Sequence, residues 1–321
     1  MSLLRVAILR ISLPVAACIS CLASGQDFPA NRPIRIATSA AGGGGDFTAR
    51  QVAQGISGPL GQAVVVDNRA SGFLAAEIVA LAPPDGHTLT VQGSTFWILP
   101  LLKKMPYDVI RDFAPITMLE QTTNVVAVHP SVPAKSIREL IDLAKAKPGA
   151  LNYGASALGS TAHLAGELFK SMAGVNIIMV PYKGAAPAVT ALVAGEIQLY
   201  IGDVGYMSPH AKAGKVRTLA VTSAQPSSLA PGLPTVSEAG VPGYVALVMS
   251  GIWAPTRTPQ AIINRLNQEI VRVLKRPEVK EKYFAAGYET VGNTPEQFAA
   301  IIKADASNMA KVIKDAAIRL D

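Results

Sequence analysis

Residues 39–50 read Ser-Ala-Ala-Gly-Gly-Gly-Gly-Asp-Phe-Thr-Ala-Arg, and this stretch decides the fold. A short β-prone segment, residues 33–38, precedes it, and a helical segment follows it. The four glycines therefore lie between a predicted strand and a predicted helix. Because glycine has no Cβ atom, such a loop lets a ligand approach the backbone closely. The helix offers unpaired amides and the positive end of its dipole, so the combination predicts an anion site.

Phosphate-binding motifs fail on spacing in this loop. A dinucleotide fingerprint that starts at Gly42 or Gly43 requires a glycine where the chain has Phe47 or Thr48. A P-loop requires Gly-Lys-Ser/Thr, whereas Asp46 follows the last glycine. We therefore interpret the predicted anion as a carboxylate. The alternative is a plain glycine-rich turn with Asp46 as the N-cap of the helix, and the glycines taken alone favour it.

The first 25 residues have the pattern of a secretory signal peptide. Arg5 and Arg10 give a positive start, an apolar stretch follows, and small residues allow cleavage before Gln26. No later segment has about 18 uninterrupted apolar residues, so we expect a soluble periplasmic protein. Lipidation at Cys18, which ends a passable lipoprotein cleavage sequence, is the weaker alternative.

The composition argues against several classes of protein. The chain has 321 residues, which is enough for two domains, and half of them are hydrophobic. Both cysteines, Cys18 and Cys21, lie in the signal segment, so the mature chain should have no disulfide and no thiolate metal site. The net charge of +7 is not gathered into a dense basic run, and aromatic residues are few. We therefore expect no nucleic-acid partner, while the mild positive excess would attract small anions.

The order of predicted elements indicates an α/β fold of two domains. Strands and helices alternate in both halves, with residues 113–118 and 124–129 expected to form two separate extended segments. If the chain crosses between domains at about residue 124 and returns at about residue 250, domain one consists of residues 26–124 plus 250–321. Domain two is then the insertion 125–249. Ligands of open α/β sheets lie beyond the carboxyl ends of strands, so the domains would face each other across a cleft.

The sequence offers no complete catalytic set. Ser156 lies in a near match to a nucleophile elbow, but Leu158 replaces the glycine that the motif requires. His163 could face the cleft, or it could be a helix-surface or supporting histidine. We predict no metal and no cofactor, because no metal-ligand spacing occurs among the four histidines, His87, His129, His163 and His210.

A second loop, residues 156–161, repeats the arrangement of strand end, glycine, hydroxyls and helix start. A hydroxyl at a helix start is usually only a cap. Two such loops, one in each domain, could nevertheless hold the two ends of a small dianion. Lys183, in a third loop, could add a cation, although a solvated lysine is the simpler interpretation.

Short motifs in a fixed order run from about residue 28 to about residue 319. The most specific are His-Leu-Ala-Gly-Glu-Leu-Phe at 163–169, Val-Pro-Tyr-Lys-Gly at 180–184 and Leu-Pro-Thr-Val-Ser-Glu-Ala-Gly at 233–240. On these motifs the chain resembles the extracytoplasmic receptors of tripartite tricarboxylate transporters, also called Bug receptors. The resemblance implies a two-domain Venus-flytrap fold with two mixed, mostly parallel sheets and no catalysis. It implies a small organic carboxylate ligand, and delivery by a monomer to large and small membrane subunits, which many receptors lack.

The resemblance also implies a site in which backbone amides of the first glycine loop, partly through water, and the 156–161 loop hold one carboxylate. Three departures from the family pattern bear on the ligand: a shortened stretch at residues 70–74, Ile-Gly-Asp at 201–203 in place of Phe-Asp-Asn, and Phe96-Trp97 in a region that is often more polar. The aromatic pair favours an aromatic or bulkier acid over citrate. We expect Gly43 and Gly44 to approach the ligand most closely. The predicted ligand-binding residues are Gly42, Gly43, Gly44, Gly45, Asp46, Thr95, Ser156, Gly159, Ser160, Thr161, His163, Lys183 and Asp203.

Two other classes of function are weighed against a receptor. A secreted α/β hydrolase acting on a small ester or amide would use Ser156, but the broken motif and the lack of a paired histidine count against it. A structural or adhesive envelope protein would not need glycine loops at strand–helix junctions.

The position of the mature N-terminus is a first testable prediction. The exported protein should begin at Gln26, because the small residues before it match what a signal peptidase reads. Intact mass spectrometry of the exported protein measures this directly. A mass that includes a diacylglycerol group on Cys18 would show that the lipoprotein alternative is correct.

Overall fold

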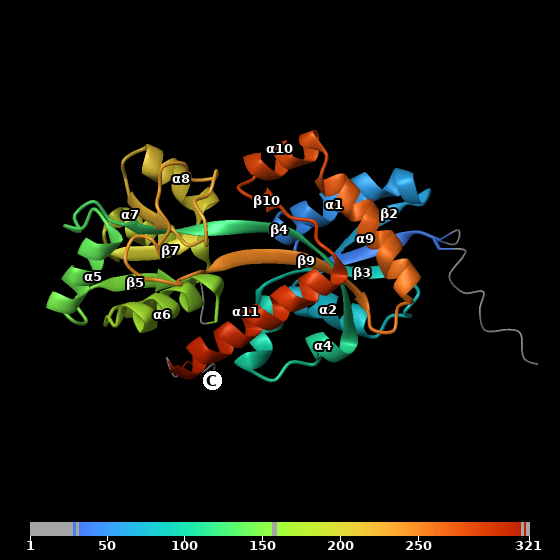
Figure 1. Ribbon diagram of the computed structural model, residues 1–321, viewed down its shortest axis with the longest axis horizontal. Helices are drawn as coiled ribbons and strands as arrows, with labels where there is room; N and C mark the ends of the chain where they lie inside the picture. The colour runs from blue at the N-terminus through green and yellow to red at the C-terminus, as the bar shows by residue number, and fades with distance from the viewer. Residues whose placement is uncertain (1–27, 30–31, 156–158, 316–317, 319–321) are drawn as a thin grey trace, which may run out of the picture.

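The structure is a computed structural model that describes residues 28–29, 32–155, 159–315 and 318. Two long antiparallel strands run through the middle of an elongated molecule, β4 (Phe113–Val128) and β9 (Leu247–Pro255) (Figure 1). With 16 residues, β4 spans about 50 Å at ~3.3 Å per residue. It is long enough to belong to both halves of the molecule, which we call the first and the second lobe.

The first lobe surrounds the early part of β4 and most of β9. Parallel pairing joins β2 to β1 and β1 to β3, while β3 pairs antiparallel with β9. The strands of this lobe are β1 (Ile34–Thr38), β2 (Val64–Asn68), β3 (Thr88–Gly93) and β10 (Glu289–Thr290). Its helices are α1 (Gly44–Leu60), α2 (Gly72–Ala80), α3 (Thr95–Ile98), η1 (Leu99–Leu101), α4 (Val109–Asp112), α9 (Gln260–Leu274), α10 (Pro277–Ala285) and α11 (Pro295–Asp315).

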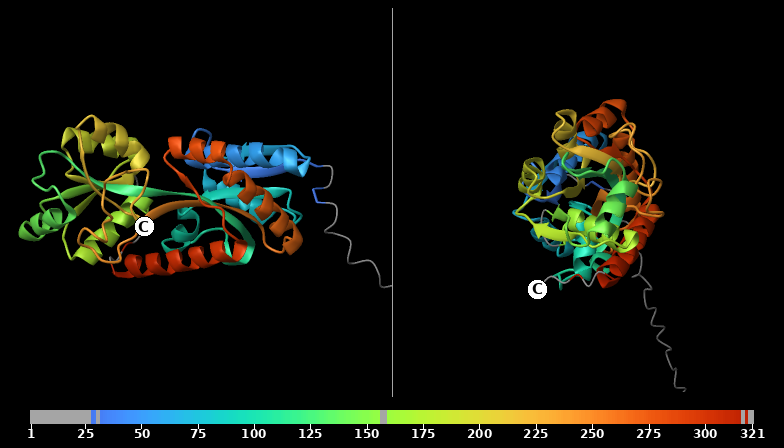
Figure 2. Two further views of the ribbon diagram at one scale, coloured as in Figure 1. Left: turned by 45° about the horizontal axis from the view of Figure 1, so that its top comes forward. Right: turned by 90° about the vertical axis from the view of Figure 1, so that its left-hand side faces the viewer.

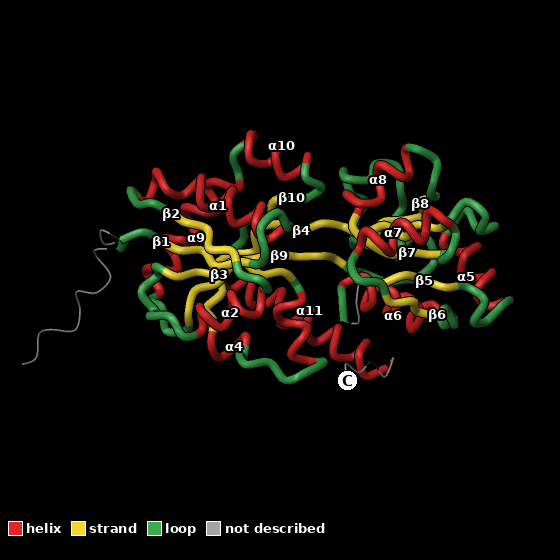
Figure 3. The backbone as a smooth tube through the Cα atoms, turned by 180° about the vertical axis from the view of Figure 1, so that it is seen from behind, coloured by secondary structure: helices red, strands yellow, loops and turns green. Residues whose placement is uncertain are grey.

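The second lobe surrounds the last part of β4. Its strands β7, β5 and β6 pair parallel in that order, and both β7 and β8 pair antiparallel with β4. Seen from behind, the two groups of strands are joined through β4 and β9 (Figure 3). The strands of this lobe are β5 (Asn152–Ala155), β6 (Ile178–Pro181), β7 (Leu199–Asp203) and β8 (Arg217–Val221). Its helices are α5 (Ile137–Ala146), α6 (Thr161–Ala173), α7 (Ala185–Ala194) and α8 (Val204–Lys212).

One expectation about β4 was wrong. The structure contains one continuous strand where two segments, 113–118 and 124–129, were predicted. Polar residues 120–124 interrupt the apolar pattern, but pairing continues through them: β9 pairs as far as Thr123, β10 pairs with Glu120 and Gln121, and β7 pairs from Asn124 onward. Partners change between Thr123, which pairs with β9, and Asn124, which pairs with β7.

Buried polar side chains connect the strands where β4 changes partner. The Asn124 N–H donates to Thr222 Oγ1 over 2.9 Å, and that hydroxyl donates to the carbonyl oxygen of Ala246 over 2.6 Å. Asn124 Nδ2 donates to the same carbonyl over 3.1 Å. Because Thr222 follows β8 and Ala246 precedes β9, these bonds join three strands at the crossing and satisfy backbone groups that would otherwise be buried unpaired.

Helix α11 contacts both lobes. Its Phe298 and Met309 belong to a core that also contains Trp253 of β9 and Leu164 of α6. Figure 2 shows the helix lying along one side of the molecule, beneath the crossing strands. The C-terminal helix is therefore a second link between the lobes, beside β4 and β9. Within the part of the chain described, no helix combines the length and apolar character needed to cross a bilayer.

The packing of α11 against β9 predicts a stability effect at Gly251. A Cβ atom at this position would overlap the ring of Phe298, so Gly251→Ala should lower the free energy of unfolding by about 1–3 kcal/mol. Gly93→Ala, on the neighbouring strand, is the matched control, because its nearest new contact would be an ordinary 3.6 Å. Urea unfolding of both variants measures the effect. Equal stability of the two variants would show that this contact does not limit packing.

Candidate functional site

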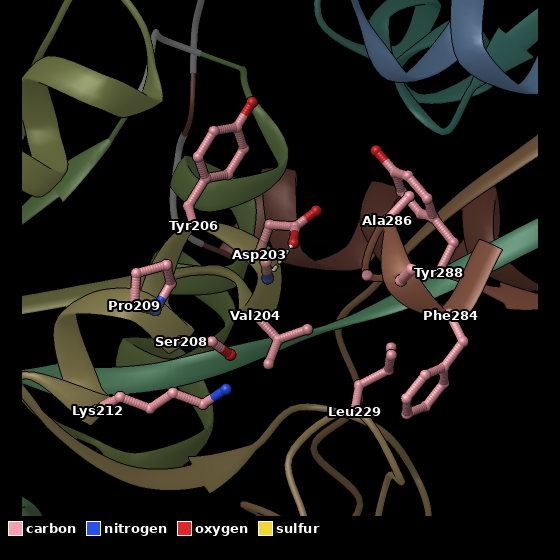
Figure 4. Close-up of a pocket in the computed structure, with 13 residues that line it drawn as sticks. Asp203, Val204, Tyr206, Ser208, Pro209, Lys212, Leu229, Phe284, Ala286 and Tyr288 are labelled. Atoms are coloured by element: carbon pink, nitrogen blue, oxygen red, sulfur yellow. Dashed lines mark hydrogen bonds between the residues drawn. The ribbon is translucent and has the colours of Figure 1, made fainter. Parts of the chain in front are cut away.

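A cavity of about 290 Å³ lies where the first glycine loop meets the crossing strands. A neighbouring cavity of about 630 Å³ shares two of its residues, Asp203 and Tyr288. Figure 4 shows this larger cavity, with Tyr206 and Tyr288 on opposite sides of Asp203. We call the smaller one the central cavity. It is lined by Ser39, Gly44, Gly45, Gly72, Phe73, Val91, Gln92, Gly93, Thr95, Phe96, Glu120, Asp203, Val248, Ser250 and Tyr288.

The first glycine loop presents the N-terminus of α1 to the central cavity. The first intrahelical bond runs from Phe47 N–H to the carbonyl oxygen of Gly43 over 3.0 Å. The N–H groups of Gly44 and Gly45 come before that bond, and both residues line the cavity. Gly42 has a φ of +83°, a conformation that favours glycine. Gly43 is not among the lining residues, so Gly44 and Gly45 are the residues of the glycine run that reach the cavity wall.

Asp46 does not cap α1, contrary to the alternative weighed from the sequence. Gly43 is the N-cap, and Asp46 lies in the first helical turn. Its carboxylate instead accepts from Gly42 N–H and from Asn68 Nδ2, each over 2.9 Å, and pairs with Arg50 Nε at 2.9 Å. Burial alone would raise the pKa of Asp46, but the bonds from Arg50, Gly42 and Asn68 outweigh it and hold the pKa below its usual value. These bonds of the Asp46 carboxylate therefore hold the first glycine loop in place.

The loop before α6 in the second lobe is held by a histidine. Gly159 N–H donates to His163 Nδ1 over 2.9 Å, and Ser160 caps α6 by accepting from His163 N–H over 3.2 Å. Burial lowers the pKa of His163, which favours the neutral ring that this bond requires. Thr161 is the first helical residue. Ser156 lies outside the described residues.

The other predicted positions fall in different surroundings. Thr95 begins α3 and lines the central cavity, while Lys183 is exposed and lines neither cavity. Asp203 caps α8 by accepting from Gly205 N–H over 2.7 Å, and burial raises the pKa of its carboxyl.

The predicted aromatic lining is wrong for Trp97. This residue is only 3% exposed, and its Nε1 donates to Asp305 Oδ2 over 2.7 Å, away from the cavity. It packs instead with Trp253 and Phe298 in the core beneath α11. Phe96 does line the cavity, although most of its surface contacts other core rings. Adjacent residues of a short helix point in different directions, so the pair could not both face the site.

Comparison with known proteins identifies the family. Residues 48–318 match the family described as "Tripartite tricarboxylate transporter family receptor". The chain belongs to this receptor family. The receptor is 35% identical over 303 residues to Protein BugT of Bordetella pertussis, which covers 92% of this chain and 93% of BugT. The resemblance inferred from the motifs is confirmed.

Solved structures share the receptor's fold. Rpa4515 of R. palustris, solved with adipate, is 36% identical with a TM-score of 0.77, covering 91% of this chain and 99% of that one. MatC of Rhodopseudomonas palustris, solved with bound malate, is 27% identical with a TM-score of 0.72. The match covers 88% of this chain and 98% of MatC. The predicted two-domain binding-protein fold is confirmed, and these relatives are solute-binding receptors rather than enzymes.

Several residues of the receptor's cavity escaped sequence reasoning. Glu120 lies on β4, is only 2% exposed and lines the central cavity beside its cross-strand neighbour Ser250. Burial raises the pKa of Glu120 to about 7. Tyr288 and Gln92 complete the polar wall. A signal for Glu120 existed, because an acid in a β-prone run of apolar residues either faces solvent or serves a site.

Metal binding has no support in the described part of the receptor, where no group of three or more histidine, cysteine or acidic side chains could hold an ion. The polar groups that line the central cavity are helix amides, hydroxyls, the Gln92 amide and two carboxyl groups. Such a set binds by hydrogen bonding and charge.

The bonds of Asp46 predict a pH-dependent stability. Asp46→Asn should lower the free energy of unfolding by about 1–3 kcal/mol at neutral pH, because a neutral amide cannot replace charge-assisted bonds to Gly42, Asn68 and Arg50. Since the folded pKa lies below the unfolded value, this stabilisation is complete above about pH 5 and is lost as the pH falls through the folded pKa.

Urea unfolding of the wild type and the variant at several pH values measures this difference, which should shrink towards acid. Asp142→Asn, an exposed carboxylate on α5, is the control and should have little effect at any pH. An Asp46→Asn variant as stable as wild type at neutral pH would contradict the role given to this carboxylate.

Proposed function

We propose that the receptor binds a small organic carboxylate in the central cavity, with the carboxylate against the N–H groups of Gly44 and Gly45. One observation carries the proposal: two amides at the N-terminus of a 17-residue helix line a cavity at the junction of the lobes. Unpaired amides and the helix dipole favour an anion there. The relatives solved with adipate and with malate support a carboxylate as that anion.

We assign the remaining predicted residues to two roles. Ser160 and Thr161 would provide the second lobe's hydrogen bonds when residues 26–124 plus 250–321 and residues 125–249 close as two domains. Asp46 and His163 would position the two loops, given their bonds to Gly42 and Gly159. Lys183 would remain solvated.

The size of the cavity supports a small acid. About 290 Å³ is at the lower end of ligand sites, and Trp97 lies in the core. This favours an aliphatic acid over the aromatic acid expected from the sequence.

We further propose that the receptor acts without chemical change of its ligand. After removal of a signal peptide, residues 1–25, it would work in the periplasm as a monomer and deliver the ligand to large and small membrane subunits of a tripartite tricarboxylate transporter. Incubation with candidate acids and their esters, followed by product analysis, tests this against the hydrolase alternative. Release of an acid from an ester would favour the hydrolase.

The helix N-terminus predicts which glycine controls binding. Gly44→Val should abolish binding of carboxylates, because its Cβ atom would lie 2.7 Å from the Tyr288 hydroxyl, at the cavity wall. No forbidden φ is involved, since Gly44 has helical geometry. Gly43→Val is the control: its Cβ atom has only an ordinary contact at 3.6 Å, its φ is −87°, and the residue does not line the cavity.

A thermal-shift screen of small carboxylic acids is the measurement. At about 100-fold excess over Kd, a ligand adds roughly 2.7 kcal/mol of stability, or on the order of 5 °C in Tm. The shift should persist in Gly43→Val and vanish in Gly44→Val. An undiminished shift in Gly44→Val would place the ligand elsewhere.

A further inference from the structure

Glu120 faces the same cavity as the amides at the start of α1. It lies on β4 opposite Ser250 of β9 and Thr290 of β10, and its side chain is only 2% exposed. Glu120 lines the central cavity together with Gly44 and Gly45. A ligand carboxylate that binds these two amides therefore enters the same small space as a carboxyl group of the protein.

The hydrogen-bond partners of Glu120 are hydroxyl groups. Ser250 of β9 and Thr48 of α1 hydrogen-bond to its side chain. A hydroxyl group can donate to a carboxylate or accept from a carboxylic acid, so these partners can satisfy Glu120 in both protonation states. Glu120 can therefore gain or lose a proton without losing its partners, unlike a carboxylate that is paired with an arginine.

No basic side chain in the described cavity wall offsets negative charge. None of the described lining residues is lysine, arginine or histidine, and Asp203 adds a second acid to the wall. The phenol groups of Tyr283 and Tyr288 lie close enough to act on Glu120, and burial raises the pKa of both, so they stay neutral. Glu289 of β10 accepts from two serine hydroxyls, over 3.0 and 3.4 Å. The charged state of Glu120 is therefore set by burial, by Asp203 and by whatever anion occupies the cavity.

An ionised Glu120 and a bound carboxylate would repel each other. Two carboxyl groups that share a site cannot easily both ionise, so one of them holds a proton. We propose that the receptor takes up one proton from solvent when it binds its carboxylate ligand, and that Glu120 holds this proton and donates a hydrogen bond into the central cavity. This inference rests on the proposed function, since it uses the ligand held by Gly44 and Gly45. The ligand keeps its full charge, and the protein provides the neutral group.

The proposal gives binding a definite pH dependence. Burial raises the pKa of Glu120 to about 7; the charge of Asp203 adds to this, and the hydroxyl groups of Ser250 and Thr48 offset part of it. A bound carboxylate raises the pKa further, so between the two values the complex holds a proton that the free receptor lacks. Because proton uptake and ligand binding are reciprocal, affinity should fall about tenfold between about pH 6.5 and pH 8.5.

Titration calorimetry of the full chain with succinate, glutarate and adipate tests the proposal. These acids are chosen because their own carboxyl groups titrate below the range of interest. The binding enthalpy at pH 8, measured in phosphate and in Tris buffer, gives the number of protons taken up, because the two buffers differ in their heat of ionisation. For the acid that binds, the wild type should take up about one proton per ligand.

Glu120→Gln keeps the size and the hydrogen-bonding capacity of a neutral Glu120 but cannot ionise. It should abolish proton uptake, make affinity independent of pH, and bind roughly tenfold more tightly than the wild type at pH 8.5. A residue that only packs would instead weaken binding equally at every pH when it is replaced. Asp305→Asn, which changes a partly buried acid outside the central cavity, is the control and should preserve both the proton uptake and the pH profile.

The outcomes separate this inference from the proposed function. If none of the three acids binds at any pH, the proposed function is wrong, and the inference with it. If an acid binds without proton uptake, or if uptake persists in Glu120→Gln, the inference is wrong while the proposed function stands. Should Glu120→Gln fail to fold, Asp203→Asn decides: uptake should persist in this variant whatever its affinity, and its loss would assign the proton to Asp203 instead.

Discussion

One strand sustains both halves of this receptor. β4 pairs with β9 and β10 in the first lobe and with β7 and β8 in the second, so neither sheet is complete without it. The exchange of partners at Thr123 and Asn124 exposes backbone groups that the Thr222 and Asn124 side chains satisfy. Because Glu120 of this strand lines the same cavity as the glycine loop of α1 and the cap of α8, the geometry of the site depends on β4.

The site combines two opposing electrostatic environments within about 290 Å³. Helix amides at Gly44 and Gly45 provide partial positive charge without any basic side chain. Glu120 and Asp203 provide negative charge whose ionisation is made unfavourable by burial.

Sequence reasoning predicted the parts of the structure that depend on local rules. Alternation of strands and helices gave the fold class, and the glycine run gave the position of a loop between β1 and α1. It failed where residues far apart in the sequence determine the contacts of a side chain. The Asp46 carboxylate accepts a hydrogen bond from Gly42 N–H, and Asn68 at the end of β2 donates to the same carboxylate. Glu120 and Trp97 gained their roles from β9 and α11, which lie more than a hundred residues away in the chain.

Helix α11, near the C-terminus, couples the two lobes of the receptor mechanically. Phe298 of this helix packs against β9, and Met309 shares a core with Leu164 of α6. The first part of the helix therefore contacts the first lobe, and its later part contacts the second. Any rotation of one lobe against the other must slide α6 along α11 or bend that helix.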